Sequence, residues 1–182
     1  MSRIIMACLG VLMAFGAEAQ VSSFRLQASG LTCALCARSI HKNLETVPWI
    51  SRVETDLEKS EFVISVKPDM TLDPDMIRKR VEEAGFGVAG LSVNARIRPE
   101  ETVADRHVSM NGMYLHIISV KSLPADGASS MRLIDKAFLG TKDQKRYARA
   151  SRHECFLTGK ASGECCRSAA IPEGSSIFHV IM

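Results

Sequence analysis

The sequence predicts an α+β fold for residues 22–97, in which a four-stranded antiparallel sheet carries two helices on one face. Three observations predict it. Short runs of alternating apolar and polar residues are typical of half-buried strands, and two longer runs place apolar residues at helical spacing. Turn-forming residues separate these runs in the order β-α-β-β-α-β. We expect a small second α+β domain at residues 107–182, after a linker at residues 98–106.

The first predicted strand and helix flank a short loop at residues 30–36. Before the loop, Phe24, Leu26 and Ala28 alternate with polar residues, which favours a strand. After the loop, four apolar residues recur at helical spacing and make one buried stripe. These are Ala37, Ile40, Leu44 and Val47. Pro48 follows them and ends the helix.

The remaining elements complete the predicted order. Residues 50–57 and 61–67 are strand-like and are joined by a short polar turn, which predicts a hairpin. Asp73-Pro74 is typical of a helix start and Gly85 of a helix end. Residues 88–97 are the last strand. The resulting β-α-β-β-α-β unit is the ferredoxin-like arrangement.

The loop carries two cysteines, Cys33 and Cys36, separated by two residues. This spacing can bring both sulfurs to one site. The second thiol lies at a helix start, where unpaired N–H groups and the helix dipole favour a thiolate, the form that binds soft metals. The pair could also be the redox pair of a thiol-disulfide oxidoreductase or a structural disulfide. We expect His41 to be an exposed helix residue rather than a ligand.

The loop and its surroundings resemble the heavy-metal-associated domain family over residues 22–97. The family motif is GMTCxxC, and here it is Gly30-Leu31-Thr32-Cys33-Ala34-Leu35-Cys36. Leu31 replaces the usual methionine with little change of volume. An aromatic residue after the helix-ending glycine also matches, as Phe86. The family includes copper chaperones, metal-transporting ATPases and periplasmic mercuric-ion-binding proteins.

The resemblance implies that Cys33 and Cys36 are metal ligands. Two thiolates hold Cu(I) almost linearly and leave an open side, through which another metal-binding protein or transporter could exchange the ion. Soft sulfur ligands select Cu(I), Hg(II) or Zn(II). Because Zn(II) prefers four ligands and only two thiolates are visible, Cu(I) is the expected metal, with Hg(II) and Zn(II) as alternatives. We expect a metal-binding protein for sequestration or transfer, not an enzyme.

Residues 1–19 are predicted to be a signal peptide. A positive start at Arg3 precedes a short apolar run, and Ala17-Glu18-Ala19 is typical of a cleavage site. The mature protein would be exported, periplasmic or secreted. No other segment is apolar enough to cross a membrane, so no stable membrane insertion is expected after cleavage.

Charge excludes one class of partner. The chain has 23 basic and 20 acidic side chains and a net charge of +3. It contains no basic run with interleaved aromatic residues. We therefore expect no nucleic-acid partner.

Residues 107–116 contain two histidines and two methionines at regular spacing. Asn111-Gly112 predicts a two-residue hairpin turn, in which His107 faces His116 and the methionines at 110 and 113 face each other. The two pairs then lie on opposite faces of the hairpin, so they cannot form one site. The methionine face is expected to be core. The histidine pair remains a candidate for ligands.

Cysteines recur near the end of the chain. A disulfide from Cys155 to Cys165 or Cys166 is the favoured interpretation in an exported domain, and the pairing stays open. The alternative is a second metal site, with His153 or His179 as a further ligand. Between the hairpin and these cysteines, residues 131–138 are expected to be a short helix, followed by a basic helix from 142 to about 151.

Overall fold

The structure is a computed structural model that describes residues 20–31, 33–121 and 127–182. The predicted signal peptide lies outside the described residues. Among those residues, none of the helices combines the length and apolar character needed to pass through a lipid bilayer.

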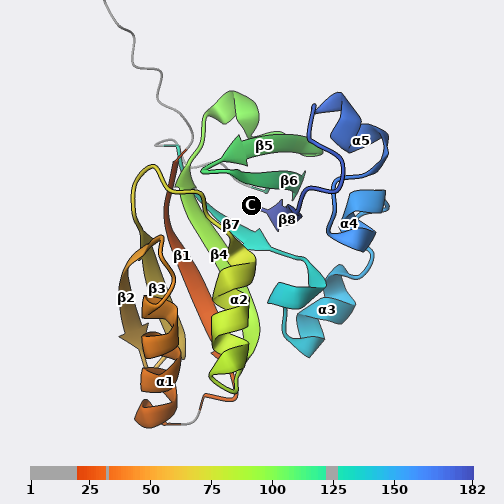
Figure 1. Cartoon of the computed structure of the whole chain (residues 1–182). Coiled ribbons are helices and arrows are strands. Elements are labelled where there is room, and N and C mark those ends of the chain that lie inside the picture. Colours follow the sequence, from red (N-terminus) through yellow and green to blue (C-terminus); the bar gives the residue numbers. More distant parts are fainter. Residues whose placement is uncertain (1–19, 32, 122–126) are drawn as a thin grey trace, which may run out of the picture.

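The first half has the predicted order of elements. These are β1 (Gln20–Ser29), α1 (Ala34–Glu45), β2 (Ile50–Asp56), β3 (Glu61–Val66), α2 (Pro74–Glu83) and β4 (Gly87–Arg96). The four strands lie side by side in the order β2-β3-β1-β4, and each neighbouring pair is antiparallel. Both helices lie on the same face of this sheet (Figure 1). The predicted ferredoxin-like βαββαβ fold is confirmed.

Local sequence signals explain these elements. The predicted apolar stripe of α1 is buried against the sheet, with Ile40 and Leu44 fully enclosed. The side chain of Asp73 caps α2 by accepting a hydrogen bond from the backbone N–H of Asp75 at 3.0 Å. Pro74 occupies the first position of the helix. Helix α2 therefore begins where its capping residues predict, and burial of one face stabilises both helices.

The sheet continues beyond β4 into the second half. Its remaining strands are β5 (Arg106–Met110), β6 (Met113–Ser119), β7 (Ala128–Leu133) and β8 (Ile177–Ile181). The eight strands are ordered β2-β3-β1-β4-β7-β8-β6-β5, with β6 and β8 parallel. Because β7 pairs with β4, the two predicted domains share one sheet and one hydrophobic core (Figure 1). The predicted linker contains a short 3₁₀ turn at Pro99–Glu101. The division into domains at residues 22–97 and 107–182 remains a prediction.

The expected helix at residues 131–138 is wrong. This segment contributes strand β7 and then a 3₁₀ turn, η2 (Lys136–Phe138). Met131 and Leu133 are buried in the core on a strand that pairs with β4. The spacing of a short apolar run does not distinguish a helix from a strand, and here the pairing with β4 determines the strand conformation. The basic helix is present as α3 (Thr141–Tyr147) and ends earlier than predicted. Two short helices follow, α4 (Glu154–Thr158) and α5 (Gly163–Ser168).

The hairpin of β5 and β6 has the predicted register. His107 pairs with His116 and Met110 with Met113, and both methionines are buried in the main core. The turn also ties the two halves together. The side-chain oxygen of Asn111 accepts a hydrogen bond from the backbone N–H of Val21 at 2.9 Å, close to the start of β1.

Candidate metal centre

The loop with the two predicted ligands joins β1 to α1. Gly30 turns the chain with φ of +77°, a conformation that glycine adopts without strain. Cys33 is the N-cap residue of α1, and its carbonyl oxygen accepts a hydrogen bond from the N–H of Ala37 at 3.2 Å. The end of β1 pairs with the start of β4, Ser29 opposite Gly87, which brings Phe86 beside the loop. Strand pairing and helix capping thus fix both sides of the loop.

The two thiols lie together at the helix start. Their Sγ atoms are 2.8 Å apart, longer than the bond of about 2.05 Å in a disulfide. The backbone N–H of Cys36 donates to Cys33 Sγ at 3.3 Å. The hydrogen bond from the Cys36 side chain, and then that from its backbone N–H, lower the pKa of Cys33. The first turn of α1 has no acidic residue to oppose a thiolate.

A bound ion would require the sulfurs to separate. With metal–sulfur bonds of about 2.3 Å, two sulfurs on opposite sides of an ion are about 4.6 Å apart. Cys33 is exposed and Cys36 is half-buried, so rotation of the Cys33 side chain is the movement that opens the pair. An ion would reach the pair from the solvent side, where Cys33 is exposed.

Apolar side chains surround the pair. Leu31 is half-buried and packs against the main core, as does Phe86. Leu35 and Leu57 are 78% and 51% exposed. A cavity of about 240 Å³ beside Cys33 is lined by Leu31, Ala34 and Leu57. Exposed apolar side chains therefore lie beside the entrance to the thiols.

His41 takes no part in this arrangement. Its ring nitrogens lie 3.0 Å from Thr55 Oγ1 and 3.3 Å from Glu45 Oε1. The contact with Thr55 holds the half-buried ring against β2. His41 is a helix residue as predicted, but it is half-buried rather than exposed, and its exclusion as a ligand stays a prediction.

The cysteines of the second half are not bonded to one another. Cys155, Cys165 and Cys166 are thiols, and they lie beside the histidine face of the β5–β6 hairpin. The sequence predicts His153 or His179 as a further ligand, whereas the structure brings His107 to these three cysteines. The signal was available, because the predicted register placed both hairpin histidines on the face opposite the core methionines.

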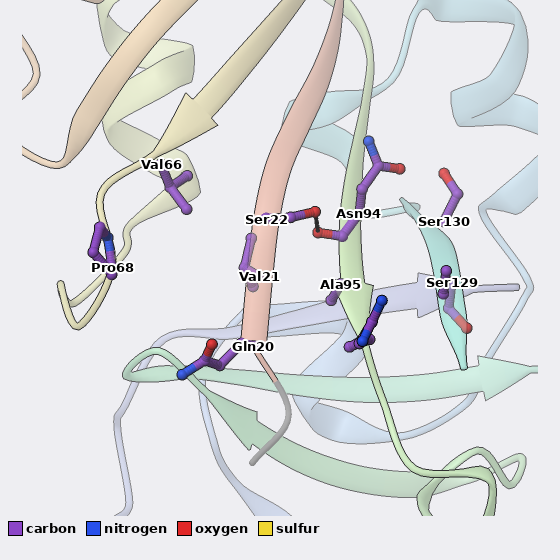
Figure 2. Close-up of a pocket in the computed structure, with 11 residues that line it drawn as sticks. Gln20, Val21, Ser22, Val66, Pro68, Asn94, Ala95, Ser129 and Ser130 are labelled. Carbon is purple, nitrogen blue, oxygen red and sulfur yellow. Dashed lines mark hydrogen bonds between the residues drawn. The ribbon is translucent and has the colours of Figure 1, made fainter. Parts of the chain in front are cut away.

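A larger cavity lies on another part of the sheet. It has a volume of about 760 Å³ and lies over β1, β4 and β7 (Figure 2). Ser22 donates a hydrogen bond there to the backbone oxygen of Asn94 at 3.0 Å. Among the described residues that line it there is no cysteine, histidine or carboxylate, so these residues offer no ligand that a soft metal prefers.

Comparisons with known proteins agree with the geometry of the loop. The family model of the heavy-metal-associated domain matches residues 25–87. A copper-transporting ATPase of Oryza sativa subsp. japonica, HMA4, is 31% identical over 70 residues, which are 38% of this chain and 7% of that protein. Human copper-transporting ATPase 2 is 28% identical over 81 residues, 44% of this chain and 5% of that protein. The chain thus spans a tenth or less of the length of these relatives.

Among solved structures, the N-terminal domain of PacS from Synechocystis PCC6803 is similar. It is 27% identical, with a TM-score of 0.32, and the match covers 36% of this chain and 91% of that domain. Residues 25–87 are therefore a heavy-metal-associated domain, on the strength of the family match and the observed βαββαβ order. The match to this family model ends at residue 87.

Proposed function

We propose that this protein is an exported, non-enzymatic metal-binding protein that binds one Cu(I) ion through Cys33 and Cys36, for sequestration or transfer. One observation carries the proposal: two thiols 2.8 Å apart at a helix start, inside a heavy-metal-associated domain. The helix start and the lowered pKa of Cys33 favour the thiolate that a soft ion needs.

The number of ligands favours Cu(I). Among the described residues, no histidine, cysteine or carboxylate atom forms a compact group of three with the two sulfurs. A tetrahedral Zn(II) site would lack two protein ligands, whereas Cu(I) and Hg(II) accept two thiolates. The named relatives that match this domain are copper-transporting ATPases, which supports Cu(I) over Hg(II).

The exposure of the pair supports transfer. Cys33 is open to solvent, and Leu35 and Leu57 present apolar surface beside it. A partner metal-binding protein or transporter could dock on this surface, and its thiolate would enter the open side of the ion. We propose export from the sequence of residues 1–19. Mass spectrometry of the protein from the producing cell tests it, since cleavage predicts a chain that begins at Gln20.

Titration of the reduced protein with Cu(I), in the presence of a competing chelator, tests the metal site. We expect the unaltered protein to bind one more tightly held equivalent than Cys33→Ser or Cys36→Ser. His41→Gln is the matched control, because it removes a potential ligand from the same helix and should retain that equivalent. Equal Cu(I) affinity in all three variants would contradict the proposal. Mercuric ion titrated in the same way establishes which metal binds more tightly.

A thiol-disulfide oxidoreductase is the second candidate function. Two observations favour this candidate. The short distance between the sulfurs assists formation of a disulfide between them. The lowered pKa of Cys33 favours the thiolate, which is the form that attacks a substrate disulfide. Insulin reduction that depends on Cys33, together with weak Cu(I) binding, would support this candidate instead.

A further inference from the structure

A second group of metal-ligating side chains lies in the other half of the molecule. Helices α4 and α5 pack beside β5, β6 and β8, at the far end of the molecule from the start of α1 (Figure 1). Cys155 lies on α4, the adjacent Cys165 and Cys166 lie on α5, and His107 lies on β5. Three separate elements therefore contribute potential ligands to one place.

The four ligand atoms are close to one another. Cys155 Sγ is 3.7 Å from Cys165 Sγ, and Cys165 Sγ is 3.8 Å from Cys166 Sγ. Cys166 Sγ is 3.8 Å from Nε2 of His107. All four atoms lie within 4.8 Å of each other. The group is compact in three dimensions rather than a chain of pairwise contacts.

These distances match the edges of a tetrahedron around a metal ion. With zinc–sulfur bonds of about 2.3 Å and zinc–nitrogen bonds of about 2.0 Å, tetrahedral geometry places two sulfurs about 3.8 Å apart and a sulfur and a nitrogen about 3.5 Å apart. The observed separations lie close to these values before any rearrangement. Three cysteines and one histidine are a ligand set of structural zinc sites.

The surroundings close the site. Cys155 and Cys166 are buried, and Ala161, Ile171 and Ile177 complete a small apolar cluster around them. This cluster is separate from the main core of the protein. Helices α4 and α5 have only five and six residues, too few for stability without strong tertiary contacts. A metal ion that joins both helices to β5 would supply those contacts.

His179 contacts the ligand group without belonging to it. Asp135 accepts hydrogen bonds from the backbone N–H and from ring Nδ1 of His179, both at 2.7 Å. The ring is thereby oriented so that Nε2 lies 3.4 Å from Cys155 Sγ. Carboxylate–histidine pairs of this kind commonly surround metal ligands. The same alignment could activate a nucleophilic thiol, but Cys155 is 0% exposed and no substrate could reach it.

We propose that Cys155, Cys165, Cys166 and His107 form a closed, four-coordinate site for Zn²⁺ that fastens α4 and α5 to the sheet. The site is distinct from the Cys33–Cys36 pair and does not depend on the function proposed for that pair. With four protein ligands it has no open position, so its role is structural.

Cobalt is a suitable probe, because tetrahedral Co²⁺ with thiolate ligands absorbs visible light strongly. The full chain with Cys33→Ser and Cys36→Ser is reduced, freed of metal with a chelator and titrated with Co²⁺. We expect one equivalent with a tetrahedral, sulfur-rich spectrum, displaced by one equivalent of Zn²⁺. Zn²⁺ should also raise the melting temperature.

Two histidine variants test the ligand assignment. His107→Gln should weaken Co²⁺ binding by about tenfold or more and shift the visible spectrum. His153→Gln is the matched control, since His153 contacts Asp105 at 3.2 Å outside the ligand group and should leave the spectrum unchanged. If His107→Gln fails to fold, Cys166→Ser replaces it in the same assay.

Three results would overturn the proposal. These are failure of the reduced chain to take up Co²⁺ or Zn²⁺, an octahedral cobalt spectrum, and a Cys155–Cys165 disulfide in protein whose thiols were trapped by alkylation at isolation. The last result would revive the disulfide expected from the sequence.

Discussion

Replacement of Met131 by alanine tests whether the two halves of the chain fold as one unit. Met131 lies on β7 in the second half, is 0% exposed, and pairs with Val93 of β4 in the heavy-metal-associated domain. The Met131 side chain belongs to the core cluster that spans both halves. Loss of this side chain therefore removes packing at the junction of β4 and β7, where the two halves of the chain meet.

The structure gives the size of the effect. Truncation of a fully buried methionine to alanine lowers the free energy of unfolding by about 2–5 kcal/mol. The loss has two parts, the transfer free energy of the removed atoms and the cost of the cavity that they leave. In a domain of this length each kcal/mol lowers the melting temperature by about 2–4 °C. A loss of about 3 kcal/mol thus lowers it by about 6–12 °C.

Tryptophan fluorescence reports the transition of the first half alone. Trp49 is the single tryptophan of the chain and is buried near Phe24, at 5.5 Å between ring centroids. If the halves unfold together, Met131→Ala in the second half shifts the Trp49 transition by the full amount. Leu157→Ala, at an exposed position of the second half, is the matched control and should change stability by less than about 0.5 kcal/mol. An unchanged Trp49 transition in Met131→Ala would show that residues 22–97 unfold independently.

Three further predictions concern the turn, the thiol and the buried histidine. Asn111→Ala leaves the N–H of Val21 without its partner, so urea denaturation should show a loss of about 1–3 kcal/mol. Because hydrogen bonds from Cys36 lower the pKa of Cys33, alkylation of Cys33 by iodoacetamide should reach half its maximal rate at a lower pH than in Cys36→Ala; equal midpoints would contradict this. Burial lowers the pKa of His116 to about 3, so the unfolded chain binds a proton that the folded protein does not. The free energy of unfolding of the metal-free protein should therefore fall as the pH is lowered from about 6.5 toward 3, and a free energy that rises over that range would refute the reasoning.

Local signals were sufficient for the first half and for the hairpin. Asp73-Pro74 marks the start of α2 and Gly85 its end, because each favours the backbone conformation or hydrogen bond that this position needs. The register of the hairpin followed from Asn111-Gly112, because a two-residue turn fixes which residues face each other. The pair Cys33 and Cys36 was equally visible, since only two residues separate the two cysteines.

Long-range pairing could not be predicted in the same way. Strand β7 was mistaken for a helix because its short apolar run has no distinctive period, and only its pairing with β4 decides its conformation. The meeting of His107 with Cys166 depends on a separation of 59 residues and on the parallel pairing of β6 with β8. Neither is encoded in a local pattern.

The central claim is that Cys33 and Cys36 are where Cu(I) binds. The most direct measurement is an NMR titration of the reduced, ¹⁵N-labelled full chain with one equivalent of Cu(I), followed amide by amide. The account predicts that the large shifts are confined to the loop around Cys33 and Cys36, the start of α1 and the neighbouring Phe86. Large shifts in α4, α5 and the β5–β6 hairpin, with the loop unaffected, would contradict it.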